Sequence, residues 1–148
     1  MKNVNSRCEN IPDFITVISD GKLTANSDPF AEIAFVELGV TPNALNAFVN
    51  ILGWEIRAFA EAIGTKERKL RLNMEHRLDK QVSENLMEIA KLCAFGTSYF
   101  DSIDIWNQWL NTPHIQFNSH KPYSVIHTIR GRELIKSAIT KLRYGFTA

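Results

Sequence analysis

The last third of the chain, residues 95–148, reads FGTSYFDSIDIWNQWLNTPHIQFNSHKPYSVIHTIRGRELIKSAITKLRYGFTA. Its first part carries two tryptophans, Trp106 and Trp109, on a short helical pattern that ends before Pro113. A polar loop follows, and Thr128 is then placed to cap a final helix. The apolar residues of this helix recur at helical spacing: Leu134, Ile135, Ala138, Ile139 and Leu142. We therefore expect this stretch to fold as helices joined by one ordered loop.

Residues 28–94 also read as helices. Asp28-Pro29 and Thr41-Pro42 each combine an N-cap residue with a proline at the first helical position. Gly39 and Gly53 follow the last apolar residue of each pattern, where helices commonly end. A longer helix is expected from residue 79 to about residue 95, with one stripe of apolar residues: Val82, Leu86, Ile89 and Cys93.

Residues 52–70, LGWEIRAFAEAIGTKERKL, have the pattern of a helix-turn-helix. Two short helices are expected, at 54–63 and from 66 to about 74, with Gly64 breaking the chain between them and Ala60 as the small residue that a tight turn needs. Arginine and lysine on the second helix of such a unit read guanine edges or grip phosphates. The candidates for DNA binding are Lys66, Arg68, Lys69, Arg71 and Arg77. A merely solvated helix face explains the same residues, and both interpretations stay open.

Residues 1–27 are polar and rich in Asn and Ser, and only the apolar patch 14–18 interrupts them. We expect a loose arm here that can dock through Phe14, Ile15 and Val17 and that has no helix signal. The fold class is therefore all-α, with three segments: residues 1–27 as the arm, 28–94 as a helix-turn-helix and dimerisation domain, and 95–148 as a small helical domain.

Composition places the chain among ordinary globular proteins, with 148 residues, 45% hydrophobic and 22% charged. Its net charge of +1 hides a segregation: residues 1–65 carry four basic and eight acidic groups, 66–80 six and three, 81–118 one and four, and 119–148 six and one. A basic island between acidic blocks is typical of a small nucleic-acid contact. No apolar run is long enough for a membrane span, and the N-terminus lacks a secretory signal, so we expect a cytoplasmic protein.

The residue types that carry catalysis or bind metals show no recognised spacing. The four histidines, His76, His114, His120 and His127, have no metal-ligand pattern, and Cys8 and Cys93 are expected to be reduced thiols. Asp101 and Asp104 are explained as the N-cap and a first-turn acid of the helix before Trp106. We find neither a phosphate-binding glycine loop nor a GxSxG nucleophile. The sequence predicts no enzyme, no cofactor and no metal.

Twelve residues of the C-terminal stretch follow one another in a recognisable order: Phe95-Gly96, Trp109-Leu110, Pro113, Pro122, Val125-Ile126, Thr128, Gly131 and Tyr144-Gly145. This order resembles the C-terminal toxin-binding domain of the Xre/MbcA/ParS family of type II antitoxins. The family usually has two glycines in the loop before the second proline, whereas this chain has Asn118-Ser119. Asn tolerates left-handed backbone angles, so the turn is expected to survive. Residues 52–70 resemble the Xre-type helix-turn-helix that precedes this domain in the same family.

The resemblance implies a function and two partners. It implies an antitoxin that neutralises a cognate toxin, often of the RES type, which consumes NAD or transfers ADP-ribose from it, and that represses its own operon by binding operator DNA as a homodimer. The family places the block in the C-terminal end, which enters the active-site cleft of the toxin. Carried over by motif, the toxin-binding residues are Arg132, Lys136, Arg143, Tyr144, Gly145, Phe146, Thr147 and Ala148.

Two other functions remain compatible with the sequence. One is a transcription regulator with no toxin partner. The other is an interaction scaffold whose DNA-binding half has decayed, because Leu72-Asn73-Met74 stands where the family often continues with arginines. Phe30, Phe35 and Phe48 are candidates for a dimer seam, and ordinary core positions are the alternative.

Overall fold

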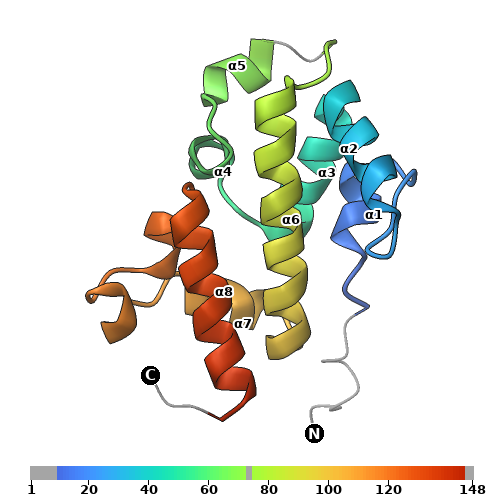
Figure 1. Ribbon diagram of the computed structural model, residues 1–148. Coiled ribbons are helices and arrows are strands. Elements are labelled where there is room, and N and C mark those ends of the chain that lie inside the picture. Colours follow the sequence, from blue (N-terminus) through green and yellow to red (C-terminus); the bar gives the residue numbers. More distant parts are fainter. Residues whose placement is uncertain (1–9, 73–74, 146–148) are drawn as a thin grey trace, which may run out of the picture. The chain divides into compact units, whose positions relative to one another are not determined.

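The computed structural model describes residues 10–72 and 75–145 of the chain (Figure 1). These residues form helices, turns and one isolated bridge between His114 and His120, with no strand among them. The all-α fold class is confirmed. In chain order the elements are α1 (Phe14–Ile18), α2 (Pro29–Leu38), α3 (Pro42–Leu52), α4 (Ile56–Ala62), α5 (Glu67–Leu72), α6 (Lys80–Phe100), α7 (Ile103–Leu110), η2 (Ile115–Phe117), η3 (Pro122–Val125) and α8 (Ile129–Arg143).

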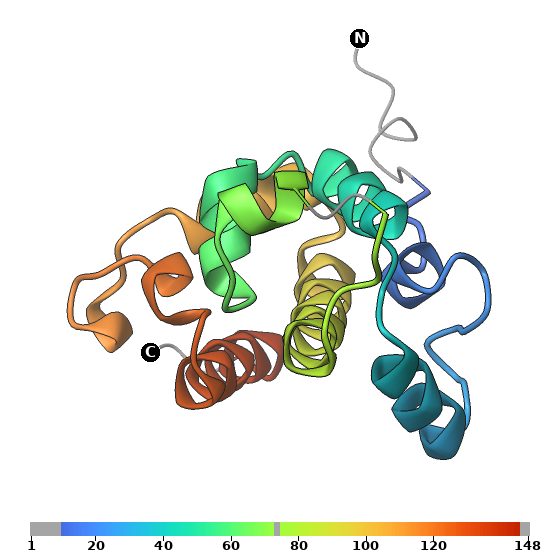
Figure 2. The same cartoon turned by 90° about the horizontal axis from the view of Figure 1, so that it is seen from above.

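The described residues divide into two compact units, Pro12–Lys91 and a second one that comprises residues 92–145 together with residues 10 and 11. The helix α6 runs through the boundary, so its first half belongs to one unit and its second half to the other. In the first unit, α1 and α2 lie on one side of α6, and α4 and α5 lie on the other (Figures 1 and 2). The segments predicted at 1–27, 28–94 and 95–148 stay a prediction.

The core of the first unit is built around three phenylalanines. Phe14, Phe48 and Phe59 are fully buried, and their rings meet edge to face at 5.5 Å and 5.7 Å between centroids. Such pairs add about 0.5–1.5 kcal/mol each beyond the burial of their area. Phe35 is also buried, whereas Phe30 remains 80% exposed. Core packing therefore accounts for Phe35 and Phe48, and only Phe30 is left for an intermolecular seam.

The helix α1 is a difference from the expectation of an arm without helices. The Asp13 carboxylate accepts hydrogen bonds from the backbone N–H groups of Ile15 and Thr16, which caps this short helix, and also from that of Ala25. Phe14, Ile15 and Ile18 then turn into the core. One acid thus caps the helix and holds the following loop against it, a tertiary role that sequence spacing does not reveal.

The starts predicted for α2 and α3 are confirmed. The Asp28 carboxylate accepts from the N–H of Phe30, and the Thr41 hydroxyl accepts from that of Ala44, with a proline at the first position of each helix. Farther along, the segment before α6 is tied to the α2–α3 turn, because Leu78 N–H donates to the Val40 carbonyl at 2.8 Å and Arg77 Nη1 donates to the Gly39 carbonyl at 2.9 Å.

The N-cap predicted for α7 was wrong by one residue. Ser102 caps this helix, because its hydroxyl accepts from the N–H of Ile105, while Asp101 sits in the left-handed region with a φ of +59°. Asp104 is the acid of the first turn, as expected. In α8, Thr128 is the N-cap, and of the predicted apolar stripe only Leu134 is largely exposed, at 44%.

Candidate functional sites

The Phe95-Gly96 pair of the motif is explained by the packing of Trp106. Gly96 lies on α6, and the indole of Trp106 rests directly on it: a Cβ at position 96 would sit 2.3 Å from Cε3 of that ring. Trp106 is fully buried and stacks on Trp109 with 5.9 Å between ring centroids and 12° between planes. Any side chain larger than hydrogen at this position would push the tryptophan out of its place.

The Thr128 and Gly131 positions form a second close approach. The Thr128 hydroxyl accepts the N–H of Gly131 at 2.9 Å and donates to the Val125 carbonyl at 3.1 Å. A Cβ on Gly131 would lie 1.8 Å from that same carbonyl oxygen. The first turn of α8 is therefore seated on the backbone of η3, which fixes the direction in which the helix leaves the loop.

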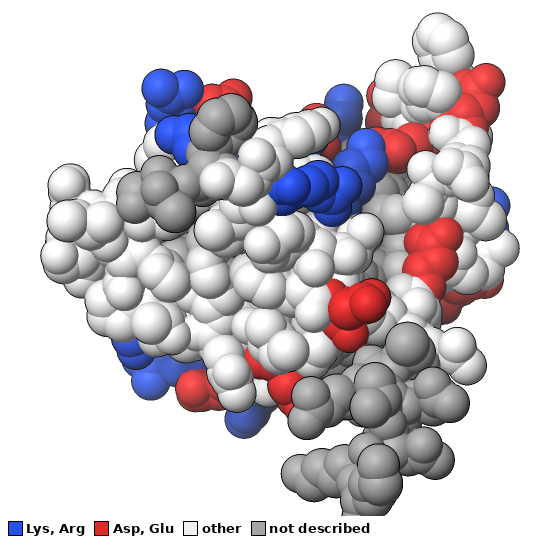
Figure 3. Space-filling model, turned by 90° about the horizontal axis from the view of Figure 1, so that it is seen from below, with Lys and Arg blue, Asp and Glu red and all other residues white. Residues whose placement is uncertain are grey.

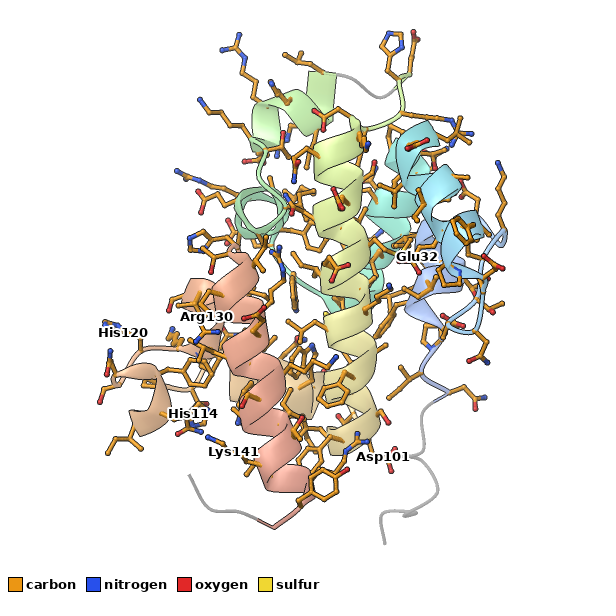
Figure 4. All side chains as sticks on the ribbon, in the orientation of Figure 1. Glu32, Asp101, His114, His120, Arg130 and Lys141 are labelled. Carbon is orange, nitrogen blue, oxygen red and sulfur yellow. The ribbon has the colours of Figure 1, made fainter. Side chains whose placement is uncertain are left out.

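The loop that departs from the family pattern keeps a tight turn. Asn118 and Ser119 both adopt left-handed angles, with φ of +54° and +62°. His114 and His120 pair on either side of this turn, where His114 N–H donates to the His120 carbonyl (Figure 4). The expectation that the turn survives without glycines is confirmed. The left-handed backbone of Ser119 destabilises the fold more than that of Asn118, because residues other than Gly, Asn or Asp are disfavoured in this conformation by about 1–2 kcal/mol.

Arg132 is a buried residue that connects α8 to the end of η3. Its side chain is buried, and Nη1 donates to the Ile126 carbonyl at 3.0 Å, which holds η3 against α8. A partner protein would meet this guanidinium only through the residues that cover it. Arg132 is therefore placed to shape the surface of the second unit, not to form its outer face.

Lys136 and Arg143 lie on the outer side of α8 and share one aromatic ring. The Lys136 Nζ is 5.6 Å and the Arg143 Cζ 5.0 Å from the centroid of Phe95, which is half-buried. Two cations seven residues apart on the helix thus hold the C-terminal turns of α8 to α6 by cation–π contacts, each worth about 0.5–1 kcal/mol at an exposed site. Sequence patterns carry no sign of this contact, because it joins two distant elements.

The end of α8 is open to solvent. Tyr144 is the C-cap residue and is 71% exposed, and Gly145 follows with a φ of +76°. The other residues predicted for toxin binding, Phe146, Thr147 and Ala148, lie outside the described residues. Along the same helix, Arg130 pairs with Glu133 at 3.0 Å, and Lys141 is exposed near the C-terminal end (Figure 4).

The residues predicted for DNA binding gather around α5. Lys66, Arg68, Lys69 and Arg71 are all exposed, and Arg71 forms an ion pair with Glu67 one turn earlier. The turn before α5 is closed by the Thr65 N–H, which donates to the carbonyl of the buried Ala60 at 2.9 Å, and Gly64 has a φ of +83°. Arg77 is exposed too, but its Nη1 is engaged by Gly39. Asn73 and Met74 of the departing tripeptide lie outside the described residues.

Cys93 is the one thiol within the described residues, and it faces the core of the second unit. Burial raises the pKa of the Cys93 thiol to about 12, an effect that the Trp106 indole partly opposes. The indole N–H has no other hydrogen-bond partner within reach in the described chain. A thiol with this pKa stays protonated and unreactive at neutral pH. Cys8 lies outside the described residues.

Neither a metal cluster nor a membrane span emerges from the described chain. Residues 10–72 and 75–145 hold no group of three or more His, Cys, Asp or Glu side chains that could bind a metal ion. Within the same ranges, no helix combines the length and the apolar character that a membrane crossing requires. His114 packs among aromatic rings, 5.2 Å from that of Trp109, while His76, His120 and His127 are exposed.

Comparison with known protein families gives a match in the C-terminal part of the chain. Residues 96–145 match the family model described as the antitoxin Xre/MbcA/ParS C-terminal toxin-binding domain. The resemblance noted from the motif residues is thereby confirmed, and the second unit carries this domain. No curated protein sequence matches the chain.

Proposed function

We propose that this chain is the antitoxin of a type II toxin–antitoxin system. The observation that carries the proposal is the match of residues 96–145 to an antitoxin toxin-binding domain, together with the packing at Gly96 and Gly131. Two of the three glycines of the motif, Gly96 and Gly131, occupy places where a Cβ would collide with a neighbouring group, so these motif residues are needed for the packing of the domain. A cognate toxin is the partner that such a domain implies.

The toxin that we propose is of the RES type, which consumes NAD or uses it for ADP-ribosylation. Inhibition requires only that the active-site cleft be occupied, so the antitoxin needs no catalytic group of its own and acts without enzymatic activity. The C-terminal end of α8 supports this mechanism, because Tyr144 is exposed and the nearby cations Lys136, Lys141 and Arg143 suit a cleft that binds an anionic dinucleotide. Occlusion is assigned to residues 144–148.

The first unit is proposed to bind the operator of the chain's own operon. The support is the pair α4 and α5, with a tight turn between them and four exposed cations in and just before α5. A homodimer would place two such helices on two half-sites. The exposed face of α2, which carries Phe30, Ile33 and Leu38, is the surface that we assign to dimerisation. We place the complex in the cytoplasm, because binding of operator DNA requires it there.

Capture of the toxin tests the proposal. The chain, tagged at its N-terminus, would be co-expressed with the product of the neighbouring gene and purified. We expect that product to co-purify in a stable ratio. A second candidate function, a transcription regulator without a toxin partner, is favoured only by the α4–α5 pair. It would replace the first if nothing co-purifies while the chain binds its own promoter in a sequence-specific manner.

A further inference from the structure

The segment from Ile105, in the first turn of α7, through η2 contains no Asp, Glu, Lys or Arg side chain. No Asp, Glu, Lys or Arg occurs between Asp104 and Lys121, although charged residues make up 22% of the chain. Apolar side chains are nevertheless exposed there: Ile115 by 80% and Ile105 by 46%. Figure 3, seen from below, shows a broad uncharged area on its left, the side on which Figure 1 draws the loop that contains η2.

These exposed residues belong to one supported surface. Ile105, Gln108 and Trp109 follow one another at i, i+3 and i+4 and share a face of α7, while Trp106 and Leu110 on the other face are buried. Trp109 is half-buried, with the rings of Trp106, His114 and Phe117 within 5.2–6.0 Å of its own. Ile115 follows His114 directly. The aromatic cluster therefore holds both the helix face and the loop in a fixed position.

A surface of this kind has the composition of the centre of a protein interface. Charged residues are depleted and aromatic residues enriched at the fully buried core of interfaces, and a fixed surface loses little side-chain entropy on binding. The outer side of α8 is different, since it carries Arg130, Glu133, Lys136, Lys141 and Arg143. The partner of the uncharged surface must therefore offer an uncharged, apolar counterpart.

The C-terminal end, residues 144–148, is too small to form the whole interface with a toxin. A stable interface takes roughly 20–30 residues and about 800 Å² from each side. Residues 144–148 can plug a cleft, but five residues span at most about 18 Å and cannot supply such an area. A second, larger contact with the same toxin is needed. The uncharged surface lies within the residues that match the toxin-binding domain, and its loop runs beside α8 in both ribbon views (Figures 1 and 2).

We infer that the uncharged surface of α7 and η2, centred on Ile105, Trp109 and Ile115, docks an apolar patch of the toxin and supplies most of the affinity. Residues 144–148 then supply the inhibition. This inference rests on the proposed function and assigns binding of the toxin and inhibition of the toxin to two different contacts. Docking and blocking are therefore separable by mutation.

The test compares three variants of the full chain against the toxin encoded by the neighbouring gene, with Kd measured for each purified protein. Ile115→Arg places a cation at the centre of the surface and is expected to raise Kd at least about 30-fold. Ile129→Arg changes an equally apolar and 72% exposed residue of α8 and serves as the matched control, with Kd expected within about threefold of wild type. Deletion of residues 144–148 is expected to keep Kd within about tenfold and yet to abolish inhibition.

The outcomes separate the inference from the proposed function. If the wild-type chain binds the toxin and Ile115→Arg binds equally well, the docking surface is wrong while the antitoxin function stands. The same holds if the truncated chain no longer binds, or if Ile115→Arg changes the oligomeric state of the free chain, which would assign the surface to a second copy. If the wild-type chain itself binds no toxin, the proposed function fails and the inference fails with it.

Discussion

The absence of a side chain at Gly131 lets the first turn of α8 pack directly on the backbone of η3. We predict that Gly131→Ala destabilises the second unit by about 2–3 kcal/mol, because its Cβ would meet the Val125 carbonyl and the backbone must shift to receive it. The measurement is the midpoint of urea unfolding. Ser137→Ala, at an exposed position of the same helix, is the control and should change stability by less than about 0.5 kcal/mol. Equal midpoints for both variants would refute the close approach.

The buried thiol of Cys93 should make the free energy of unfolding depend on pH in the alkaline range. Its folded-state pKa is raised from 9.0 to about 12, so the folded chain keeps the thiol proton that the unfolded chain releases above pH 9. The contribution is complete below pH 9 and is lost as the pH rises toward 12, by on the order of 1 kcal/mol at pH 10. The free energy of unfolding would be measured from pH 8 to pH 10.5 for wild type and Cys93→Ala. Wild type should lose stability more steeply; parallel curves would contradict the burial of this thiol.

At the scale of elements, the caps were the most predictable features. Asp28, Thr41 and Thr128 could be assigned from sequence because an N-cap depends only on the next few residues. For α7 the sequence predicts Asp101 as the N-cap, whereas the left-handed backbone at Asp101 leaves this role to Ser102, a residue type that caps helices equally well. The helix α1 escaped prediction because it is five residues long and depends on burial against α3.

The candidate site was predictable only where a motif encodes it. Gly96 and Gly131 belong to the motif, and the structure gives their reason. The contact of Lys136 and Arg143 with Phe95 joins α8 to α6, so no local pattern announces it. The charge-free segment between Asp104 and Lys121 could have been found in the sequence, but its meaning depends on the exposure of Ile105 and Ile115.

The element α5 carries the prediction for DNA binding. Reversing two charges, Arg68→Glu together with Arg71→Glu, should weaken operator binding and lower the slope of log K against log salt by about 2, because each phosphate contact contributes about 1. Toxin capture should not change. Lys22→Glu, an exposed charge reversal in the loop before α2, is the matched control and should leave the slope as it is. Unchanged binding of the double variant would place the DNA surface elsewhere.

At the scale of the whole molecule, α2 has apolar residues on both sides. Phe35 and Val36 face the core, whereas Phe30, Ile33 and Leu38 are exposed, and a helix apolar all round is usually covered on both sides. We predict that light scattering finds wild type as a dimer and Phe30→Glu as a monomer with weaker operator binding. Leu72→Glu, 70% exposed on α5, should remain dimeric. A monomeric wild type, or a dimeric Phe30→Glu, would contradict this assignment.

Growth of cells that express the neighbouring toxin tests the central claim most directly. Expression of the toxin alone should arrest growth, co-expression of the full chain should restore it, and co-expression of a chain lacking residues 144–148 should not, although that chain accumulates in folded form. Continued arrest in the presence of the full chain would contradict the antitoxin function. Restored growth with the truncated chain would contradict occlusion by the C-terminal end.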